Sequence, residues 1–295
     1  MLKTSRRALI QGALVAISSL LTSGCSSLRR STQEKSLRKI AFITDFHYAG
    51  EAAHRTAWSR LLLSLERENV DLVIGGGDWI TEGALVSRIE ARARLEMFAT
   101  LWKELPYRKT LIMGNHDLVR SEDGFSLSSD LFREIFPEWS SNNRIDFEEG
   151  TILTLQSVAP EGSHYRGHVS SEQMEWLKEQ IVEISTERPL FLVTHIPFLT
   201  SLYQRTKGIG FTPPEDQFIT NGPDVLNLFD KHNLKIVLQG HLHVHEEIRW
   251  RDTHFITGGA VCGKWWHGAH HGTPPGFRLI EISGQDVGGR YVTIG

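Results

Sequence analysis

Short apolar runs, each followed directly by polar residues, recur along this chain from Lys39 onward. Such runs, rich in Ile, Leu, Val and Phe and bounded by Gly or Asp, are typical of strands buried on both faces. The segments that fit are residues 39–45, 71–78, 109–115, 151–158, 189–195, 235–241, 253–259 and 277–282. Between several of them lie segments with helical periodicity, at residues 57–68, 84–105, 170–184 and 223–232. This alternation predicts an α/β fold in which helices cover the sheets.

One domain is expected for residues 39–295, because this stretch contains no repeat, no low-complexity tract and no internal linker. Ser170 or Ser171 is a predicted N-cap for the helix that follows, and Pro223 suits the first turn of another. The hydrophobic fraction of 40% and the charged fraction of 23% are ordinary for a globular domain.

Carboxylate, amide and imidazole side chains follow the predicted strands. The set is Asp45, His47, Asp78, Asn115, His116, His195, His241 and His243. Ligands of open α/β sheets gather at the carboxyl ends of strands, so these side chains are expected to share one crevice. Two pairs, Asp45 with His47 and His241 with His243, are spaced two residues apart. If these residues continue their strands, the two side chains of each pair lie on the same face of the sheet and can bind one ion together.

The donor set indicates two metal ions. Two carboxylates, one amide and four imidazoles, leaving His116 aside, are too many ligands for one four-coordinate ion. Nitrogen and oxygen donors of this kind fit Fe, Mn or Zn. Asp78, which follows three glycines, is the natural bridging carboxylate. Two divalent ions with two carboxylates leave a positive site that attracts phosphate and lowers the pKa of a bound water to about 7.

The motifs D-x-H, G-D, G-N-H-D, an isolated His and G-H-x-H, in this order, resemble the calcineurin-like metallophosphoesterase family in its bacterial, exported form. The resemblance spans essentially residues 39–295. It implies a four-layer α/β/β/α sandwich with two mixed β-sheets. It also implies dinuclear-metal-dependent phosphoester hydrolysis in which a metal-bridging hydroxide attacks phosphorus. Carried over residue by residue, Asp45, His47 and His243 hold the first metal, Asn115, His195 and His241 hold the second, and Asp78 bridges them.

The same resemblance assigns a catalytic role to His116, which would stabilise developing charge and donate a proton to the leaving oxygen. Asp117 is expected to fix the tautomer of that imidazole by accepting its other N–H. The alternative for Asp117 is an N-cap of the following segment. Gly114 is expected to allow a sharp turn at the strand end.

A Gly-rich segment near the C-terminus contains Trp265, Trp266 and His267. It resembles a segment of some bacterial family members, although His271 stands where those have Asp. One indole is expected to cover the crevice and stack on the organic part of the substrate, and a structural clamp is the alternative. His267, with His270 and His271, either contacts substrate phosphate or an extra metal or lies on the surface. An aromatic lid slightly favours a phosphodiester over a phosphomonoester.

The first residues have the features of an export signal. Arg6-Arg7 precede an apolar run, Ala8 to Leu21, followed by "TSGCSS". This pattern predicts a twin-arginine-like signal peptide at residues 1–24, with Cys25 as a lipidation site. Residues 25–38 are a predicted polar tether, and the mature protein is expected in the periplasm or anchored to a membrane facing it. A short amphipathic helix of a cytosolic protein is the alternative.

Charge and composition narrow the function classes. A formal charge of −3, without a Lys/Arg-rich stripe, disfavours a nucleic-acid polymer as partner. The expected substrate is a small-molecule, lipid or nucleotide phosphoester, and the oligomeric state is open. Two rival functions remain: a metal-binding or surface-binding lipoprotein that keeps the fold without turnover, and a protein phosphatase, which needs a more open groove.

Overall fold

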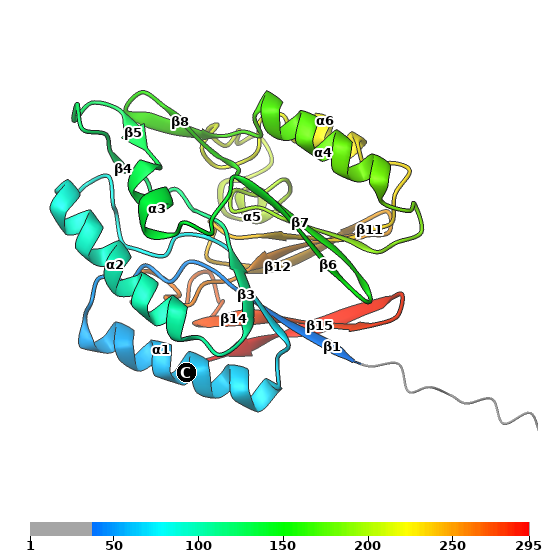
Figure 1. Cartoon of the computed structure of the whole chain (residues 1–295), viewed down its shortest axis with the longest axis horizontal. Helices are drawn as coiled ribbons and strands as arrows, with labels where there is room; N and C mark the ends of the chain where they lie inside the picture. The colour runs from blue at the N-terminus through cyan, green and yellow to red at the C-terminus, as the bar shows by residue number, and fades with distance from the viewer. Residues whose placement is uncertain (1–36, 295) are drawn as a thin grey trace, which may run out of the picture. The chain divides into compact units, whose positions relative to one another are not determined.

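Two sheets form the centre of the molecule in the computed structural model, which describes residues 37–294 (Figure 1). The strands of the first sheet are β1 Arg38–Ile43, β2 Leu72–Gly75, β3 Arg108–Leu111, β14 Gly276–Ser283 and β15 Asp286–Thr293. Their order is β15-β14-β1-β2-β3. β1, β2 and β3 are parallel, whereas β14 and β15 pair antiparallel, so the sheet is mixed.

The second sheet has six strands, in the order β12-β13-β11-β10-β7-β6. They are β6 Asn142–Phe147, β7 Gly150–Leu155, β10 Leu190–Val193, β11 Leu234–Gln239, β12 His245–Trp250 and β13 Thr253–Gly258. The four inner strands are parallel, and the two edge strands are antiparallel. Two hairpins lie apart from both sheets: β4 Val119–Arg120 with β5 Leu127–Ser128, and β8 Val158–Glu161 with β9 His164–Gly167.

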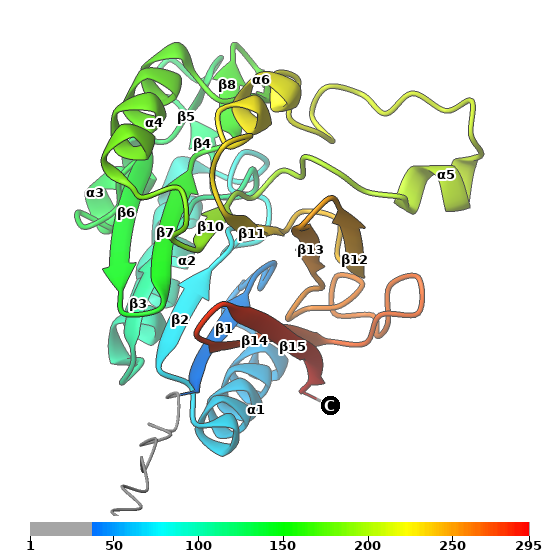
Figure 2. The same ribbon diagram turned by 90° about the vertical axis from the view of Figure 1, so that its right-hand side faces the viewer.

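Helices lie on the outer faces of the two sheets (Figure 1). The helices are α1 Ala52–Glu68, α2 Arg88–Glu104, α3 Asp130–Ile135, α4 Ser171–Glu183, α5 Leu202–Lys207 and α6 Gly222–Asn227. α1 and α2 lie beside the first sheet, and α4 and α6 beside the second. Figure 2 shows α5 on a segment that extends away from the sheets. No helix within residues 37–294 has the length and apolar character needed to cross a membrane.

Side-chain alternation along the strands builds the layers. In β1, Ile40 and Phe42 belong to the core between the two sheets, with residues such as Phe191 of β10. Ala41 and Ile43, which point the other way, belong to the core that also contains the buried residues of the helices. Both faces of the strands are therefore apolar, as the continuous apolar runs predict. The α/β/β/α sandwich with two mixed sheets is confirmed.

Helix boundaries differ in part from the predicted ones. Ser170 caps α4, where its side chain accepts the Gln173 N–H and the Gln173 side chain accepts the Ser170 N–H, as in a capping box. α2 begins at Arg88 rather than at residue 84, because the Ser87 hydroxyl accepts the Glu90 N–H and starts the helix there. α1 begins earlier than predicted, at Ala52.

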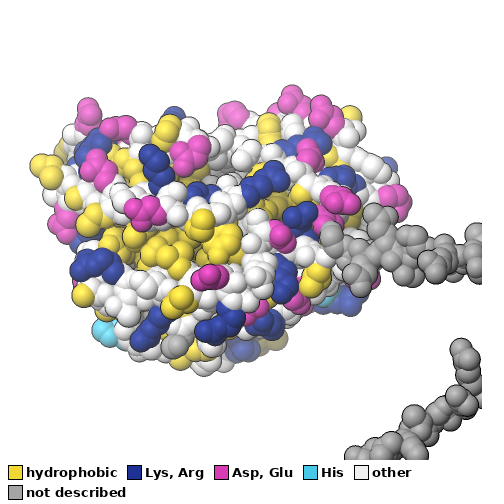
Figure 3. All heavy atoms as spheres, turned by 60° about the horizontal axis from the view of Figure 1, so that its bottom comes forward, with side chains coloured by type: hydrophobic (Ala, Val, Ile, Leu, Met, Phe, Trp, Pro, Cys, Tyr) yellow, Lys and Arg dark blue, Asp and Glu magenta, His cyan; other side chains and the backbone are white. Residues whose placement is uncertain are grey.

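The surface in Figure 3 carries an apolar area with basic and acidic side chains interspersed around it. The predicted signal at residues 1–24, with Cys25, and nearly all of the tether at residues 25–38 lie outside the described residues.

Candidate metal centre

The clustered polar residues lie just beyond the strand ends, in backbone that turns left-handed. The φ angles are 56° at Asp45, 49° at His47, 57° at Asp78, 71° at His241 and 55° at His243. Non-glycine residues rarely adopt positive φ, and strain of this kind is concentrated at functional sites. The D-x-H and H-x-H pairs therefore do not continue their strands. Strand alternation therefore does not explain why these pairs converge. The side chains of both pairs nevertheless lie in the cluster, as predicted.

Asp45, His47 and His243 form one group of donor atoms. The two Nε2 atoms of His47 and His243 lie 3.0 Å apart, and His243 Nε2 lies 3.3 Å from Asp45 Oδ1. All three side chains are buried. Asp45 is held from behind, because its Oδ2 accepts the Thr44 hydroxyl at 2.6 Å and both its oxygens accept the His241 backbone N–H.

Asn115, His195 and His241 form the second group. Asn115 Oδ1 lies 3.0 Å from His195 Nε2 and 2.9 Å from His241 Nδ1. The three side chains come from the ends of β3, β10 and β11, which are brought together where the carboxyl edges of the two sheets meet.

Asp78 joins the two groups. Its Oδ2 lies 3.6 Å from His47 Nε2 and 3.3 Å from His195 Nε2, so one oxygen faces both sets of donors. Its Oδ1 accepts the His116 backbone N–H at 2.8 Å. Donor atoms spaced closely enough to hold a cation occur in both groups, and Asp78 belongs to both. This is the position required of a bridging carboxylate.

Hydrogen bonds behind the imidazoles fix which nitrogen faces the cluster. His195 Nδ1 lies 2.7 Å from the Gly76 carbonyl, and His243 Nδ1 lies 2.7 Å from the Gly263 carbonyl. Each Nδ1 carries the proton, because a carbonyl only accepts, and each Nε2 lone pair then points inward. A cation bound between the inward-facing lone pairs and the carboxylate oxygens would balance their mutual repulsion. Two N/O-bound metal ions such as Fe, Mn or Zn fit this donor set.

The pKa values of the imidazoles report the electrostatic potential of the cluster. Burial lowers the pKa of His195, but the Asp78 carboxylate outweighs it and raises that pKa to about 9. Burial also lowers the pKa of His243, and Asp45 raises it well above its ordinary value. The Asp78 and Asp45 carboxylates therefore favour positive charge at His195 and His243, whereas burial lowers the pKa of His47 and lowers that of His241 to about 3.

Glycines leave room for the cluster. A Cβ at Gly114 would overlap Asp78 Oδ1, and a Cβ at Gly77 would lie 2.6 Å from His195 Nδ1. Gly77 also has φ +97°, whereas Gly114 does not adopt a positive φ. The close approach of the Asp78 carboxylate, rather than left-handed backbone, therefore requires glycine at position 114.

Asp117 binds backbone rather than the His116 ring. Its Oδ2 accepts the N–H groups of Asp78 and Gly114, and its Oδ1 accepts those of Trp79 and Ile80, at 2.8–3.1 Å. The side chain is fully buried, and within residues 37–294 it makes no hydrogen bond to His116. The predicted tautomer-fixing contact is therefore replaced by a clamp between the loops that follow β2 and β3.

His116 lies at the rim of the cluster. Its ring packs edge-on against His47 and Trp265, with centroids 4.8 and 4.9 Å away. The side chain is half-buried and makes no hydrogen bond to any residue between 37 and 294. His116 thus faces the cluster without being one of its donors, which is the place required of an acid for a leaving oxygen.

The two adjacent indoles have different environments. Trp265 lies over the cluster, with its ring centroid 4.1 Å from that of His47 and 5.1 Å from that of His243, and it is 37% exposed. Trp266 donates its indole N–H to the His47 carbonyl and stacks on His54 at 4.2 Å. Trp265 therefore covers the cluster, and Trp266 is held by His47 and His54; the predicted contact of these indoles with substrate stays a prediction.

Other histidines and one cysteine surround the cluster. His267 is exposed, and no contact with the donor groups is present among the described residues, so its predicted role in substrate binding stays a prediction. The His270 ring lies 6.1 Å from that of His243. Cys262, which sequence reasoning did not include, is buried with its Sγ 3.6 Å from His243 Nδ1. No motif marks it.

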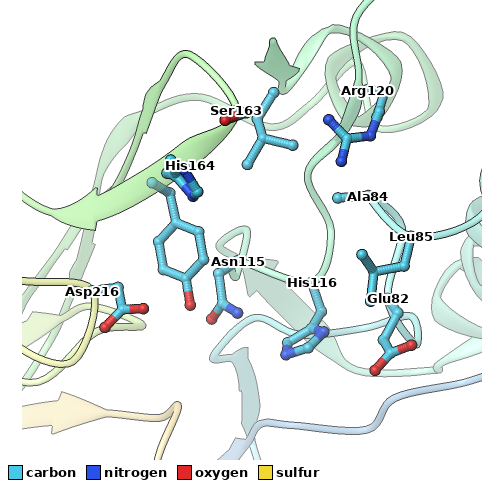
Figure 4. A pocket seen from close by; sticks show the side chains of 11 residues that line it. Glu82, Ala84, Leu85, Asn115, His116, Arg120, Ser163, His164 and Asp216 are labelled. Atoms are coloured by element: carbon cyan, nitrogen blue, oxygen red, sulfur yellow. The ribbon is translucent and has the colours of Figure 1, made fainter. Parts of the chain in front are cut away.

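A pocket of about 250 Å³ opens beside Asn115 and His116 (Figure 4). Its other lining residues are Glu82, Ala84, Leu85, Arg120, Leu127, Ser163, His164, Tyr165 and Asp216. These residues come from the turn before α2, the two hairpins and the segment after α5. No sequence pattern predicts that they meet.

Comparisons with solved structures support the fold. A dimetal phosphatase from Danio rerio shares 13% identity over 88% of this chain and 99% of that chain, with a TM-score of 0.59. A purple acid phosphatase from seeds of yellow lupin (Lupinus luteus) shares 14% identity over 88% of this chain and 52% of that chain, with a TM-score of 0.61. At these identities the likeness concerns the fold. No curated protein sequence matches the chain.

Residues 38–245 match the family model described as calcineurin-like phosphoesterase, and this match spans most of the chain. It includes all seven predicted metal ligands and His116. Members of this family depend on two metal ions, and the clustered His and Asp side chains meet that requirement. The chain is a phosphoester hydrolase that belongs to the calcineurin-like phosphoesterase family.

Proposed function

We propose that this hydrolase is a phosphodiesterase whose two metal ions are held by the residues of the candidate centre. One observation carries the dinuclear part of the proposal: Asp78 Oδ2 faces a donor nitrogen of each group, at 3.6 and 3.3 Å. Asp45, His47 and His243 would hold one ion, and Asn115, His195 and His241 the other. When bound, such ions polarise phosphoryl oxygens and lower the pKa of a bound water to about 7.

Four other roles in the reaction are assigned to His116, Asp78, Asp117 and Trp265. His116, half-buried beside the cluster, would donate a proton to the leaving oxygen. Asp78 fixes the backbone at His116, because its Oδ1 accepts the His116 backbone N–H. Asp117 holds both loops in register through backbone N–H groups. Trp265 covers the His47 side of the centre and excludes water there.

Two different surfaces flank His116 and support a diester rather than a monoester. One is the indole face of Trp265, 4.9 Å from the His116 ring between centroids. The other is the pocket in Figure 4, where His116 and Asn115 form part of the wall. A phosphodiester has an organic arm on each side of phosphorus, so it can occupy both surfaces, whereas a monoester fills only one. Trp265 also obstructs the broad approach that a phosphoprotein needs.

The test compares bis(4-nitrophenyl) phosphate with 4-nitrophenyl phosphate, using protein depleted of metal and then reloaded with Mn²⁺, Zn²⁺ or Fe²⁺. We expect the diester to have a kcat/KM at least about tenfold higher, since one arm adds contacts worth a few kcal/mol. Asp78→Ala serves as the inactive control. A preference for the monoester would contradict the diesterase proposal, and inactivity of every reloaded form toward both esters would contradict hydrolysis.

We also propose that the protein is exported and anchored by lipid at Cys25. Arg6-Arg7, the apolar run to Leu21 and the small residues before Cys25 support this proposal. Mass spectrometry of the N-terminal peptide from membrane fractions tests it. The expected result is an acylated Cys25 as the first residue. The Cys25→Ser variant is expected in the soluble fraction instead of the membrane fraction. An unprocessed N-terminus would contradict the proposal.

A further inference from the structure

We infer that the pocket beside His116 binds one arm of the substrate, and that Arg120 there pairs with an anionic group on this arm, a carboxylate or a phosphate. The inference rests on the proposed phosphodiesterase function and narrows its substrate class. The preferred substrate is then a diester with one aromatic or apolar arm over Trp265 and one small, polar, anionic arm in the pocket.

Arg120 differs from the guanidinium groups around it. Three arginines of α2 are paired with carboxylates: Arg88 with Asp130 at 2.7 Å, Arg92 with Glu134 at 2.6 Å, and Arg94 with Glu90. Arg120, on β4, is half-buried, and no carboxylate between residues 37 and 294 pairs with it. Its guanidinium points into the pocket (Figure 4). A partly desolvated guanidinium without a partner is a ready site for a carboxylate or phosphate, whose oxygens it binds in pairs.

Arg88 also positions Arg120. The Arg88 guanidinium donates to the backbone carbonyl of Arg120 at 3.0 Å while it pairs with Asp130. The strand that carries Arg120 is therefore tied to α2. Fixing the backbone at Arg120 in advance reduces part of the entropy lost when an anion binds.

Two carboxylates restrict what the pocket accepts. Glu82 and Asp216 line it on other sides than Arg120 (Figure 4). Asp216 Oδ1 is shielded from solvent and has no hydrogen-bond partner among the described residues. An unsatisfied buried acceptor is costly, so a ligand that donates a hydroxyl or ammonium hydrogen there is favoured. An anionic group is bound only where it reaches Arg120, because elsewhere the carboxylates repel it.

The size of the pocket limits the arm further. About 250 Å³ is below the range of about 300–1,000 Å³ that is usual for whole small-molecule ligands. The pocket therefore suits one short arm of a substrate rather than a whole nucleotide or a long acyl chain. Ala84, Leu85 and Leu127 give this arm a few apolar contacts, and Tyr165 is also part of the lining.

The test uses a series of 4-nitrophenyl phosphodiesters with the metal-loaded protein. The second arm is propyl, 3-aminopropyl, 2-carboxyethyl or 2-phosphoethyl, and release of 4-nitrophenolate is followed. Wild-type protein is expected to prefer one of the anionic arms over propyl by at least about tenfold in kcat/KM, as charge-assisted hydrogen bonds allow. The better of the carboxylate and the phosphate identifies the anion.

Variants assign the preference to Arg120. Arg120→Ala is expected to bring the ratio of anionic to propyl kcat/KM close to one, and Arg120→Lys to retain part of it. Arg166→Ala is the matched control. Arg166, on β9, pairs with Glu161 at 3.7 Å and is not among the residues that line the pocket. The ratio of anionic to propyl kcat/KM of Arg166→Ala is expected to equal that of the wild type.

A second measurement does not depend on turnover. Calorimetric binding of 2-carboxyethyl phosphate and propyl phosphate to the metal-loaded wild type and Arg120→Ala should show the same preference. A propyl or aminopropyl preference in the wild type, or an anionic preference that survives Arg120→Ala, overturns the inference. If the propyl, carboxyethyl and phosphoethyl diesters are all hydrolysed equally, only this inference fails. If no diester is hydrolysed, the phosphodiesterase proposal fails, and the binding comparison still decides the role of Arg120.

Discussion

Asp117 Oδ2 accepts the backbone N–H of Asp78 at 3.0 Å, across 39 positions of the sequence. Asp117 is itself outside the donor groups, yet it holds the loop that carries the bridging candidate. The same oxygen accepts the Gly114 N–H at 2.8 Å, so the loops that follow β2 and β3 share one anchor. The geometry of the centre thus depends on a buried carboxylate that binds only backbone.

Asp117→Asn is expected to destabilise the protein. The amide offers one acceptor oxygen in place of two, so two of the four backbone N–H groups face an N–H donor. Each buried donor left unsatisfied costs about 1–3 kcal/mol, and we expect a loss of about 3 kcal/mol in the free energy of unfolding. Urea denaturation of the metal-free protein measures it.

Asp123→Asn is the control for this change, because exposed Asp123 also accepts two backbone N–H groups, from Phe125 and Ser126. Water replaces those bonds, so the loss is expected to be much smaller. Equal effects of the two substitutions would contradict the anchoring role of Asp117.

Asp78→Ala is expected to lower metal content from two ions per chain to one or fewer. Removing the shared oxygen takes a ligand from both groups at once, while His195→Ala takes a ligand from one group only. Elemental analysis of purified, reloaded protein gives the ratio. Asp146→Asn, on β6 and paired with Arg144, is the control and should keep two ions. Two tightly held ions in Asp78→Ala would rule out its bridging position.

His116→Gln is expected to slow the chemical step about 10²–10⁴-fold for diesters with alkyl leaving groups. The effect should be much smaller for 4-nitrophenyl esters, because 4-nitrophenolate leaves without a proton. Metal content should stay at two, since His116 is not one of the donor atoms. A series of leaving groups of rising pKa measures the difference, and His254→Gln, a surface histidine paired with Glu247, is the control. A uniform loss over the series would exclude proton donation.

The two tryptophans are expected to respond differently to truncation. Trp265→Ala should raise KM for aromatic diesters several-fold, with little change in stability, because the ring is partly exposed over the cluster. Trp266→Ala should lower the free energy of unfolding by about 3 kcal/mol, since it loses the His54 stack, the contact with Phe46 and the bond to the His47 carbonyl. Thermal denaturation and steady-state kinetics of both variants separate the roles, and the reverse pattern would contradict the assignment.

Inner strands were predictable because they are buried on both faces. The apolar runs of β1, β2, β7, β10 and β11 report this burial directly. Of the edge strands, β3 was predicted within residues 109–115, whereas β6, β12 and β15 were missed. β12 reads HEEIRW and β15 reads DVGGRYVT, so polar residues and glycines obscure their pairing. Edge positions tolerate such residues because one side of the strand stays in water.

The predicted ligands were brought together, but by a different backbone. Strand alternation was expected to align Asp45 with His47, whereas both have positive φ beyond the end of β1. Tertiary hydrogen bonds stabilise this conformation: the Asp45 and His47 N–H groups bind the carbonyls of Gly77 and Asp78. Local propensity does not predict left-handed backbone at Asp or His, because the compensating bonds come from a distant loop.

The identity and order of the polar residues at the strand ends were enough to predict the family, the fold and the donor set, because metal chemistry selects residue types and parallel strands bring their carboxyl ends to one edge. Only the tertiary structure decided that Asp117 binds backbone, that Trp265 rather than Trp266 covers the centre, and that Arg120 and Asp216 line one pocket. The physical reason is that these roles depend on which atoms of separate loops lie within a few ångströms of each other. The spacing of residues along the chain does not determine those distances.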